Sequence, residues 1–302
     1  MKRLIIIAFL LASGVQAQQI THHFLGNRSE RTYDADRVSQ WKNFWTPLQL
    51  GSALRLFLVD STLTESGSLT NWTDSSGSGL TASNTNAGSQ PSIIEINVRH
   101  AASFNGTSSF LIVPPFSVSN SVAMFVVARS EEWKKGTPGD GNYRKILAKG
   151  DTDSPTSGIM MVLDGTTYLD WALDDFSLLG NGYGASSYPR NVSPVSVTNG
   201  QTCIIGGVLS ETQAKSFVNG TETTPRSATA ASVPLSTSGM RICVNAFDLD
   251  NQYWKAEIFA ILFIQADLSA EDRYKIEGWA AWRYGIQGDL PSGHPYKYAA
   301  PK

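Results

Sequence analysis

Acidic residues at strand-like spacing are the first candidates for chemistry in this sequence. Asp170 and Asp174, in "YLDWALDD", stand at i and i+4, which places both on one face of an extended strand. Their Cα atoms would lie about 13 Å apart, whereas the two carboxyl groups of a glycosidase lie about 5–9.5 Å apart. Glu95 and Glu257 each lack a second acid on the same strand face. We therefore expect no paired-acid catalysis and no enzyme.

The histidines give no nucleophile or zinc pattern either. His22 and His23 lie near the N-terminus. His100 lies in a predicted turn and His294 in the C-terminal tail. None stands beside a Ser or Cys elbow, no Gly-x-Ser-x-Gly is present, and no Cys/His spacing indicates zinc. We expect each histidine to be solvated or to cap a turn.

Calcium is the cofactor for which the sequence offers ligands. Asp248, Asp250 and Asn251 lie in "FDLDNQ", just before a predicted strand. Asp151 and Asp153 lie in a second loop, "KGDTDS". Oxygen ligands at i and i+2 suit calcium, which takes six or more of them and so needs several loops. The alternative is that these Asp/Asn runs are simple turns.

Aromatic residues in polar loops are candidates for contact with sugars, because their rings offer flat apolar faces. "SEEWKKGTPGDGNYRK" places Trp133 among charged residues, with Tyr143 in the same loop. "GNGYGASSYPRN" offers Tyr183 and Tyr188. The alternative for Trp133 is packing within its own loop. The tryptophans in or beside predicted strands are expected in the core: Trp72, Trp171 and Trp254.

The first 17 residues have the pattern of a secretory signal peptide. Lys2 and Arg3 precede an apolar run, and Ala17 ends a small-residue cleavage site. The run is shorter than the ~20 residues that span a bilayer, and no cysteine follows the site to carry a lipid anchor. We expect cleavage after Ala17, a polar arm over 18–46, and a secreted mature chain without a membrane span.

The cysteines, Cys203 and Cys243, lie in the predicted strands "QTCIIGGVL" and "GMRICVNAF". An exported chain permits a disulfide, but strand cysteines also serve as small buried hydrophobes. Alternation places Cys243 on the face of Arg241, away from Ile242, whereas Cys203 shares a face with Ile205. Because these surroundings differ, we favour two unbridged thiols.

Composition narrows the class of protein. The 302 residues are 41% hydrophobic and 17% charged, with 26 glycines, which favours many turns and few long solvated helices. Without Lys2 and Arg3 the chain has 22 basic and 26 acidic residues, a net charge of −4. Nucleic-acid binding depends on clustered Lys and Arg side chains, and this mildly acidic chain has no such cluster. We therefore exclude nucleic acid as a partner.

Short apolar segments separated by Gly/Ser/Asn/Pro-rich turns predict an all-β sandwich or barrel. The pair Asn219-Gly220 in "FVNGTE" predicts a tight hairpin. "WKAEIFAILFI" is apolar along nearly its whole length, which predicts a central strand covered on both faces. The predicted strands are 54–60, 109–113, 122–129, 145–150, 158–163, 167–173, 202–209, 214–220, 240–246 and 254–264.

The order of several segments resembles a known family. "WTPLQLGSALRLFLVDS" precedes "LTNWTDSSGSGLTAS" and "ASFNGTSSFLIV", and the chain closes with "LSAEDRYKIEGWAAWRYGIQGDLPSGHPYKYAAP". These segments resemble the laminin-G-like, concanavalin A-like jelly-roll modules of bacterial exported and phage structural proteins. The resemblance covers about Pro47 to Pro301, and "LFLVDS" departs from the aromatic-Leu-Asp-Ala run of many relatives. It implies one domain over 47–302, with two stacked antiparallel sheets and adjacent ends.

One helix is expected, in "LSAEDRYKIEGWAAWRYGI". Ser269 has the position of an N-cap, with Asp272 three residues on. Ile276 and Trp279 follow helical spacing, and Gly278 allows close approach. A membrane-surface helix would need a Lys/Arg-rich face, which this segment lacks. The resemblance implies that this helix packs across the sandwich.

We therefore expect a non-catalytic, extracellular or virion-surface jelly-roll module for glycan binding, cell-surface adhesion or display. Such a module would be a phage decoration, fibre or tail-associated protein, or a bacterial exported carbohydrate-binding protein. Its partners would be a glycan or cell-surface polysaccharide, and virion or homo-oligomer subunits. Two alternatives remain: a secreted polysaccharide-degrading enzyme of the concanavalin A-like fold, and a purely structural assembly subunit.

Overall fold

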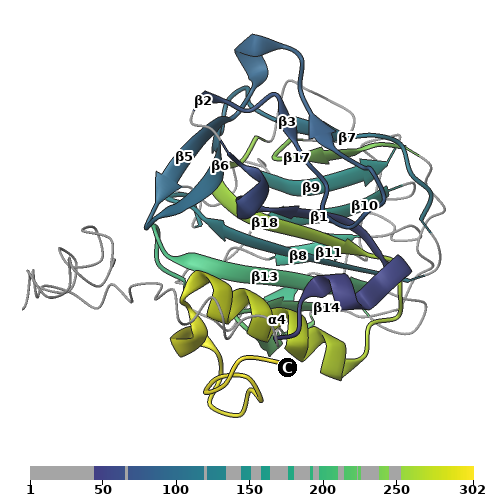
Figure 1. Ribbon diagram of the computed structural model, residues 1–302, viewed down its shortest axis with the longest axis vertical. Coiled ribbons are helices and arrows are strands. Elements are labelled where there is room, and N and C mark those ends of the chain that lie inside the picture. The colour runs from purple at the N-terminus through teal and green to yellow at the C-terminus, as the bar shows by residue number, and fades with distance from the viewer. Residues whose placement is uncertain are drawn as a thin grey trace, which may run out of the picture. The chain divides into compact units, whose positions relative to one another are not determined.

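The computed structural model describes most of the chain from Phe44 onward (Figure 1). The chain divides into two compact units, Met1–Phe44 with Lys302 and Trp45–Pro301, and nearly all described residues belong to the second. The predicted leader and most of the predicted arm lie outside the described residues, so both stay predictions. The described ranges are 44–64, 67–118, 121–133, 144–150, 158–163, 176–179, 191–192, 197–209, 214–222, 224–225, 238–244 and 253–302.

Sheet A contains nine of the described strands, all paired antiparallel. Its order is β15-β14-β13-β8-β18-β6-β5-β2, and β1 pairs with β18 beyond the end of β6. The predicted central strand, β18, thus has neighbours along both edges. The strands are β1 (Leu54–Val59), β2 (Gly67–Ser68), β5 (Ser92–Ile96), β6 (Arg99–Asn105), β8 (Val122–Arg129), β13 (Thr202–Leu209), β14 (Ala214–Val218), β15 (Thr221–Glu222) and β18 (Lys255–Ile264).

Sheet B contains the other nine described strands, in the antiparallel order β16-β12-β11-β10-β9-β17-β7-β4-β3. The two sheets form the predicted all-β sandwich. The strands are β3 (Asn71–Trp72), β4 (Ala82–Ser83), β7 (Leu111–Val113), β9 (Arg144–Gly150), β10 (Gly158–Leu163), β11 (Phe176–Leu179), β12 (Asn191–Val192), β16 (Thr224–Pro225) and β17 (Met240–Ile242).

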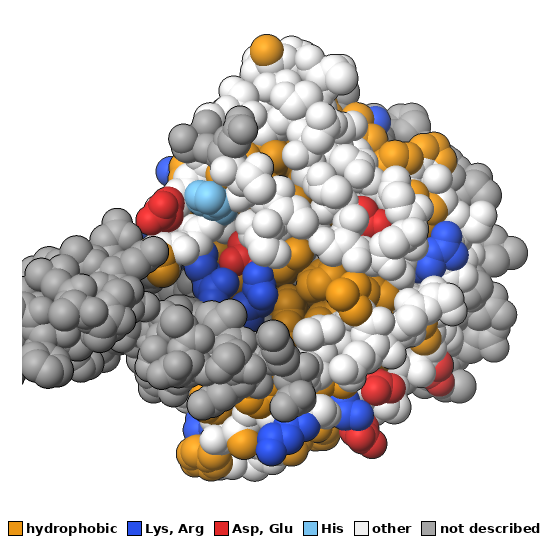
Figure 2. Space-filling model, in the orientation of Figure 1, with side chains coloured by type: hydrophobic (Ala, Val, Ile, Leu, Met, Phe, Trp, Pro, Cys, Tyr) orange, Lys and Arg blue, Asp and Glu red, His pale blue; other side chains and the backbone are white. Residues whose placement is uncertain are grey.

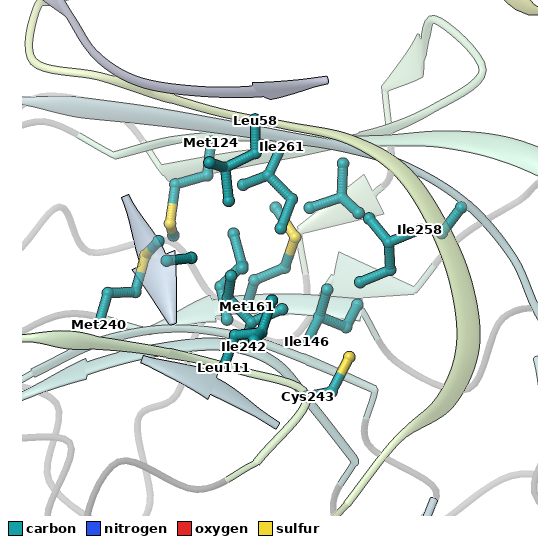
Figure 3. Packing of buried hydrophobic residues seen from close by; sticks show 14 of the residues in the cluster. Leu58, Leu111, Met124, Ile146, Met161, Met240, Ile242, Cys243, Ile258 and Ile261 are labelled. Carbon is teal, nitrogen blue, oxygen red and sulfur yellow. The ribbon is translucent and has the colours of Figure 1, made fainter. Parts of the chain in front are cut away.

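An apolar layer, the inner core, fills the space between the sheets (Figure 3). In β1, Leu56 and Leu58 face this layer, whereas Phe57 and Val59 face the other side of sheet A. Period-two alternation therefore buries both faces of the strand, which explains why its sequence is apolar without interruption. Members of the inner core in Figure 3 include Leu58, Met124 and Ile261 from sheet A and Leu111, Ile146, Met161, Met240 and Ile242 from sheet B.

Strand β18 changes face in its middle. Ile258 and Ile261 belong to the inner core, whereas Phe259 and Ala260 lie together on the opposite face. The pairing with β8 shifts register between Ile258 and Ala260, the mark of a β-bulge. Because the run is apolar on both sides of the bulge, the sequence pattern did not reveal it.

The second apolar layer, the outer core, lies between sheet A and the helix α4 (Ala270–Tyr284) (Figure 1). The Ser269 hydroxyl accepts a hydrogen bond from the Asp272 amide at 3.0 Å, and Gly285 ends the helix with φ 75°. Ile276 and Trp279 face sheet A, where the Trp279 ring meets the Phe57 ring edge-on at 5.4 Å. The predicted cap and the predicted packing of this helix across the sandwich are both confirmed.

The C-terminal tail packs back onto α4 through the 3-10 helix η5 (Gln287–Asp289). The Trp282 indole donates to the Tyr296 carbonyl at 2.7 Å, and a Cβ on Gly278 would lie 2.5 Å from that of Tyr296. His294 is buried with its Nε2 3.2 Å from Glu277, so it is not solvated, but its Nδ1 accepts the Tyr296 amide at 3.2 Å and thus caps the turn, the other expected role. The Trp45 amide donates to the Pro301 carbonyl at 3.0 Å, which confirms that the ends of this unit are adjacent.

The segment after β3 covers one edge of β1. The Asp74 carboxylate accepts the Phe57 amide at 2.9 Å, and the Ser75 amide donates back to the Phe57 carbonyl at 2.8 Å. The Trp72 indole donates to the Val59 carbonyl at 3.2 Å. A strand edge with its amides and carbonyls paired in this way offers no template for another chain. The segment "NWTDSSGSG" thus occupies the edge of β1 at which a neighbouring strand would otherwise pair.

Both cysteines are buried and unbridged, as favoured from the sequence. The predicted facing of Cys243 is wrong, because β17 ends at Ile242 and Cys243 has φ 63°, which interrupts the strand alternation. Cys203 and Cys243 both lie in the inner core, where burial raises the pKa of each thiol. In the part of the chain that the structure describes, no helix is long and apolar enough to cross a membrane.

Candidate ligand-binding site

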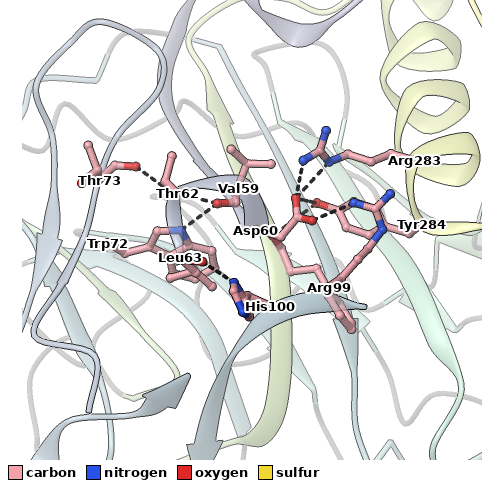
Figure 4. A network of polar contacts seen from close by, with 11 residues as sticks. Val59, Asp60, Thr62, Leu63, Trp72, Thr73, Arg99, His100, Arg283 and Tyr284 are labelled. Carbon is pink, nitrogen blue, oxygen red and sulfur yellow. Dashed lines mark hydrogen bonds and ion pairs between the residues drawn. The ribbon is translucent and has the colours of Figure 1, made fainter. Parts of the chain in front are cut away.

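Four side chains meet where β1 ends, and we call this group the Asp60 centre: Asp60, Arg99, Arg283 and Tyr284 (Figure 4). Asp60 follows β1 directly and begins the 3-10 helix η3 (Asp60–Thr62), Arg99 begins β6, and the other two end α4. The centre therefore joins a strand end, a neighbouring strand and the helix that covers the sheet.

The Asp60 carboxylate accepts four hydrogen bonds from these neighbours. Arg99 Nη1 donates to Oδ2 at 2.8 Å. Arg283 donates to Oδ1 through Nε at 2.9 Å and Nη2 at 2.6 Å, and the Tyr284 hydroxyl donates to the same oxygen at 3.1 Å. A carboxylate so occupied is an anchor for the two guanidinium groups and is not available as a general base.

Electrostatics keep Tyr284 and Arg283 in the forms that donate these hydrogen bonds. Burial raises the pKa of Tyr284, and the neighbouring Asp60 charge raises it further, so the hydroxyl keeps its proton and donates. Burial opposes the charge on Arg283, but Tyr284 and Asp60 outweigh it and raise the pKa of the guanidinium. Both groups thus remain hydrogen-bond donors to Asp60.

The arginines of the centre reach solvent although the carboxylate does not. Side-chain exposure is 17% for Arg99 and 26% for Arg283, against 5% for Asp60. In Figure 2 basic side chains lie beside apolar side chains on the face that carries β1 and α4. Partly buried apolar residues that pack on the outer core are Leu50, Ala53, Ile94, Ile96, Ala266, Tyr284 and Ile286.

A second carboxylate, Glu257 on β18, lies near an arginine on the same side of sheet A. Arg129 Nη1 is 3.9 Å from Glu257 Oε2, while Nη2 donates to Glu131 at 2.9 Å and Nε to the Gly200 carbonyl at 2.8 Å. Glu257 Oε2 is buried and accepts no hydrogen bond from the described residues. Burial raises the pKa of Glu257, with Arg129 acting against the shift and Glu131 adding to it. We call these residues the Glu257 centre.

The structure corrects the expectation for Trp133. Its side chain is 1% exposed, its ring packs on Trp254 with centroids 5.3 Å apart, and its indole donates to the Gln201 carbonyl at 2.8 Å. Trp133 therefore belongs to the inner core and offers no face to a sugar. Exposure of Trp133 was predicted from its charged sequence neighbours, but burial of its large apolar ring decides its position. Trp72 and Trp254 are fully buried, as predicted.

The remaining predicted site residues lie outside the described part of the chain and stay predictions: Tyr143, Tyr183, Tyr188, Asp151, Asp153, Asp248, Asp250 and Asn251.

Sequence reasoning missed the Asp60 centre. Its signal is an aspartate that ends an apolar strand, in "LFLVDS", together with Arg283 and Tyr284 in the last turn of the helix. Each feature alone is common, since acids often begin turns and basic residues often end helices. Which charges meet is decided by the fold, because Arg99 lies 39 and Arg283 lies 223 positions from Asp60.

No family model matches the sequence, and no curated protein matches it. Domain 4 of AbnA, a GH43 extracellular arabinanase from Geobacillus stearothermophilus solved with arabinotriose, is similar in structure, with TM-score 0.51 and 16% identity over 72% of this chain and 95% of that one. Trypanosoma rangeli sialidase has TM-score 0.51 and 14% identity over 78% and 33% of the two chains. For the binding domain of Paraclostridial Mosquitocidal Protein 1 the TM-score is 0.52 and the identity 12%, over 78% and 53%.

This chain thus spans nearly all of the arabinanase domain, about half of the mosquitocidal binding-domain structure and about a third of the sialidase. At such identities the likeness is one of fold. The chain has an antiparallel β-sandwich fold.

Proposed function

We propose that this protein is a non-catalytic glycan-binding module of the laminin-G-like, concanavalin A-like jelly-roll type, acting outside the cell or on a virion surface. The observation that carries the proposal is the likeness to domain 4 of the arabinanase, which spans 95% of that domain and was solved with a trisaccharide. The secretory pattern at the N-terminus supports an extracellular setting.

The chemistry of the described centres supports binding in preference to catalysis. Asp60 is held by four hydrogen bonds, and Glu257 and Glu131 share one arginine. A glycosidase needs one acid that can protonate the leaving group and one that faces the sugar from the other side. The Asp60 centre holds a single carboxylate, and the two carboxylates of the Glu257 centre face the same arginine.

A glycan array with the purified chain tests the proposal. We expect saturable binding to at least one glycan class, confirmed by calorimetry in solution. If the chain bound no glycan on a broad array that includes bacterial cell-surface polysaccharides, the proposed binding role would be contradicted. The bound glycans, incubated with the chain and assayed for new reducing ends, should stay intact, and turnover would contradict the non-catalytic part.

A further inference from the structure

We propose that the outer side of α4, together with the C-terminal tail, binds an uncharged polysaccharide chain through a row of aromatic rings. We call this surface the aromatic stripe: Tyr274, Trp282, Tyr296 and Tyr298. The inference rests on the proposed function, because it gives the module a site and a class of glycan. All four residues belong to the continuous described segment 253–302.

Helical spacing lines up the first part of the stripe. Tyr274, Gly278 and Trp282 stand four positions apart in α4, so they follow one another along one side of the helix. Ile276 and Trp279 occupy the side that faces sheet A, whereas Tyr274 and Trp282 are half-buried at the surface. The eight residue steps from Tyr274 to Trp282 cover about 12 Å. A row of this length suits several units of a sugar chain better than one free sugar.

The C-terminal tail, yellow in Figure 1, lies against α4 on the side away from the strands and adds a third ring to the row. The Trp282 indole donates to the Tyr296 carbonyl at 2.7 Å, and glycine at position 278 lets the Tyr296 Cβ approach the helix closely. The His294 ring lies 5.1 Å from the Tyr274 ring and 6.1 Å from the Tyr296 ring, centroid to centroid, and its Nδ1 accepts the Tyr296 amide. Because Tyr296 is held in place before a ligand arrives, binding costs it little conformational entropy.

The stripe also carries hydroxyl groups that the described part of the chain does not use. The Tyr284 hydroxyl donates within the Asp60 centre, whereas those of Tyr274, Tyr296 and Tyr298 bond no described residue. Tyr298 is 78% exposed, and it is the only exposed aromatic residue among the described side chains. A sugar ring presents C–H groups on its face and hydroxyls at its edge. Flat aromatic rings with free hydroxyls beside them match both parts of it.

The lysines next to the stripe are already paired, which favours an uncharged ligand. Lys275 Nζ lies 2.7 Å from the Glu271 carboxylate. Lys297 Nζ donates to the Gly288 carbonyl at 2.7 Å. An acidic glycan would have to displace one of these partners to gain a charge contact, whereas the hydroxyls of a neutral sugar need no charged partner.

The test is binding of neutral arabinan, xylan and dextran, measured by affinity electrophoresis and calorimetry, beside acidic polygalacturonate. We expect the wild-type chain to retain at least one neutral polysaccharide, with little change at high salt because no charge contact is involved. Tyr298→Ala should weaken that binding about tenfold, the effect of losing one stacking ring. Tyr298→Phe, which keeps the ring, should weaken it less. Tyr274→Ala, in the helix, should act like Tyr298→Ala.

Val98→Ala is the matched control, because Val98 is an apolar residue that is 75% exposed, at the turn between β5 and β6 and outside the stripe. Its affinity should equal that of the wild type. Thermal melts of all variants separate lost binding from lost folding.

Two results would overturn the inference and leave the proposed function standing. One is a folded Tyr298→Ala or Tyr274→Ala variant that binds neutral polysaccharide like the wild type. The other is a wild-type chain that binds polygalacturonate alone. Absence of binding to every glycan would overturn both the inference and the proposed function.

Discussion

Asp60 and Glu257 both place a carboxylate near arginine on the α4 side of sheet A, yet their surroundings differ. Asp60 accepts four hydrogen bonds and is tied to two arginines, one from a strand and one from the helix. Glu257 has an arginine nitrogen at 3.9 Å, beyond hydrogen-bond distance, and a buried oxygen that accepts nothing from the described residues. Glu131, a second acid, takes the stronger bond from the same arginine.

The comparison shows that burying a charged group has two different consequences, depending on its hydrogen bonds. A carboxylate whose oxygens are all occupied recovers the cost of leaving water and joins the elements around it. A carboxylate with a buried oxygen that accepts no hydrogen bond keeps part of that cost, and burial accordingly raises the pKa of Glu257. Asp60 is thus expected to stabilise the attachment of α4, whereas ionised Glu257 is expected to weaken the fold slightly.

The largest effect is expected for Asp60→Asn. The substitution keeps the shape but removes the charge that two arginines share, so the free energy of unfolding should fall by about 3 kcal/mol, as when one partner of a buried ion pair is lost. Urea denaturation measures it. Glu95→Gln, at an exposed acid on β5, is the control and should change stability by less than about 0.5 kcal/mol. If Asp60→Asn and Glu95→Gln changed the free energy of unfolding equally, Asp60 would not be a stabilising charge.

Tyr284→Phe should have an intermediate effect. The change removes a hydroxyl 3.1 Å from Asp60 and 3.3 Å from the Phe259 carbonyl, while the bonds from Arg283 remain. Stability should fall by about 1 kcal/mol, the net value of one hydrogen bond. Tyr298→Phe, at a side chain that is 78% exposed, serves as control in the same denaturation experiment and should match the wild type.

Glu257→Gln should be neutral or stabilise the protein at pH 7, by less than about 1 kcal/mol, because it replaces a poorly bonded charge with a neutral group of the same shape. Arg129 would keep its bonds to Glu131 and Gly200. Calorimetric melting of the variant beside the wild type measures the change. A loss of more than about 1 kcal/mol would place Glu257 with Asp60 as a stabilising charge.

The smallest expected effect is a pH dependence of the stability difference between the wild type and Glu257→Gln. Because burial raises the pKa of Glu257, the folded chain still holds its proton at pH values where the unfolded chain has lost it. The stability cost of the ionised group is therefore largest above the folded pKa, shrinks as the pH falls through it, and vanishes below the unfolded value. Wild type and Glu257→Gln should converge in melting temperature between pH 7 and pH 4, and a widening gap would contradict the assignment.

Local patterns predicted nine of the eighteen described strands, since period-two burial and turn residues act within a few positions. The Asn219-Gly220 hairpin has positive φ at both residues, and the Ser269 cap forms as predicted. The errors arose where a distant part of the chain decides the outcome. Trp133 is buried because Trp254 lies beside it, and Cys243 leaves the strand alternation where β17 ends. The Asp60 centre joins residues more than 200 positions apart, which no local pattern records.

The hydrogen bond from the Trp45 amide to the Pro301 carbonyl has a practical consequence. Because the first and last residues of the Trp45–Pro301 unit touch, the unit can be spliced as a cassette into a surface loop of a carrier protein, through short linkers and without stretching either partner. The same closeness permits circular permutation, with new ends opened at an exposed turn such as the one at Val98, which is 75% exposed.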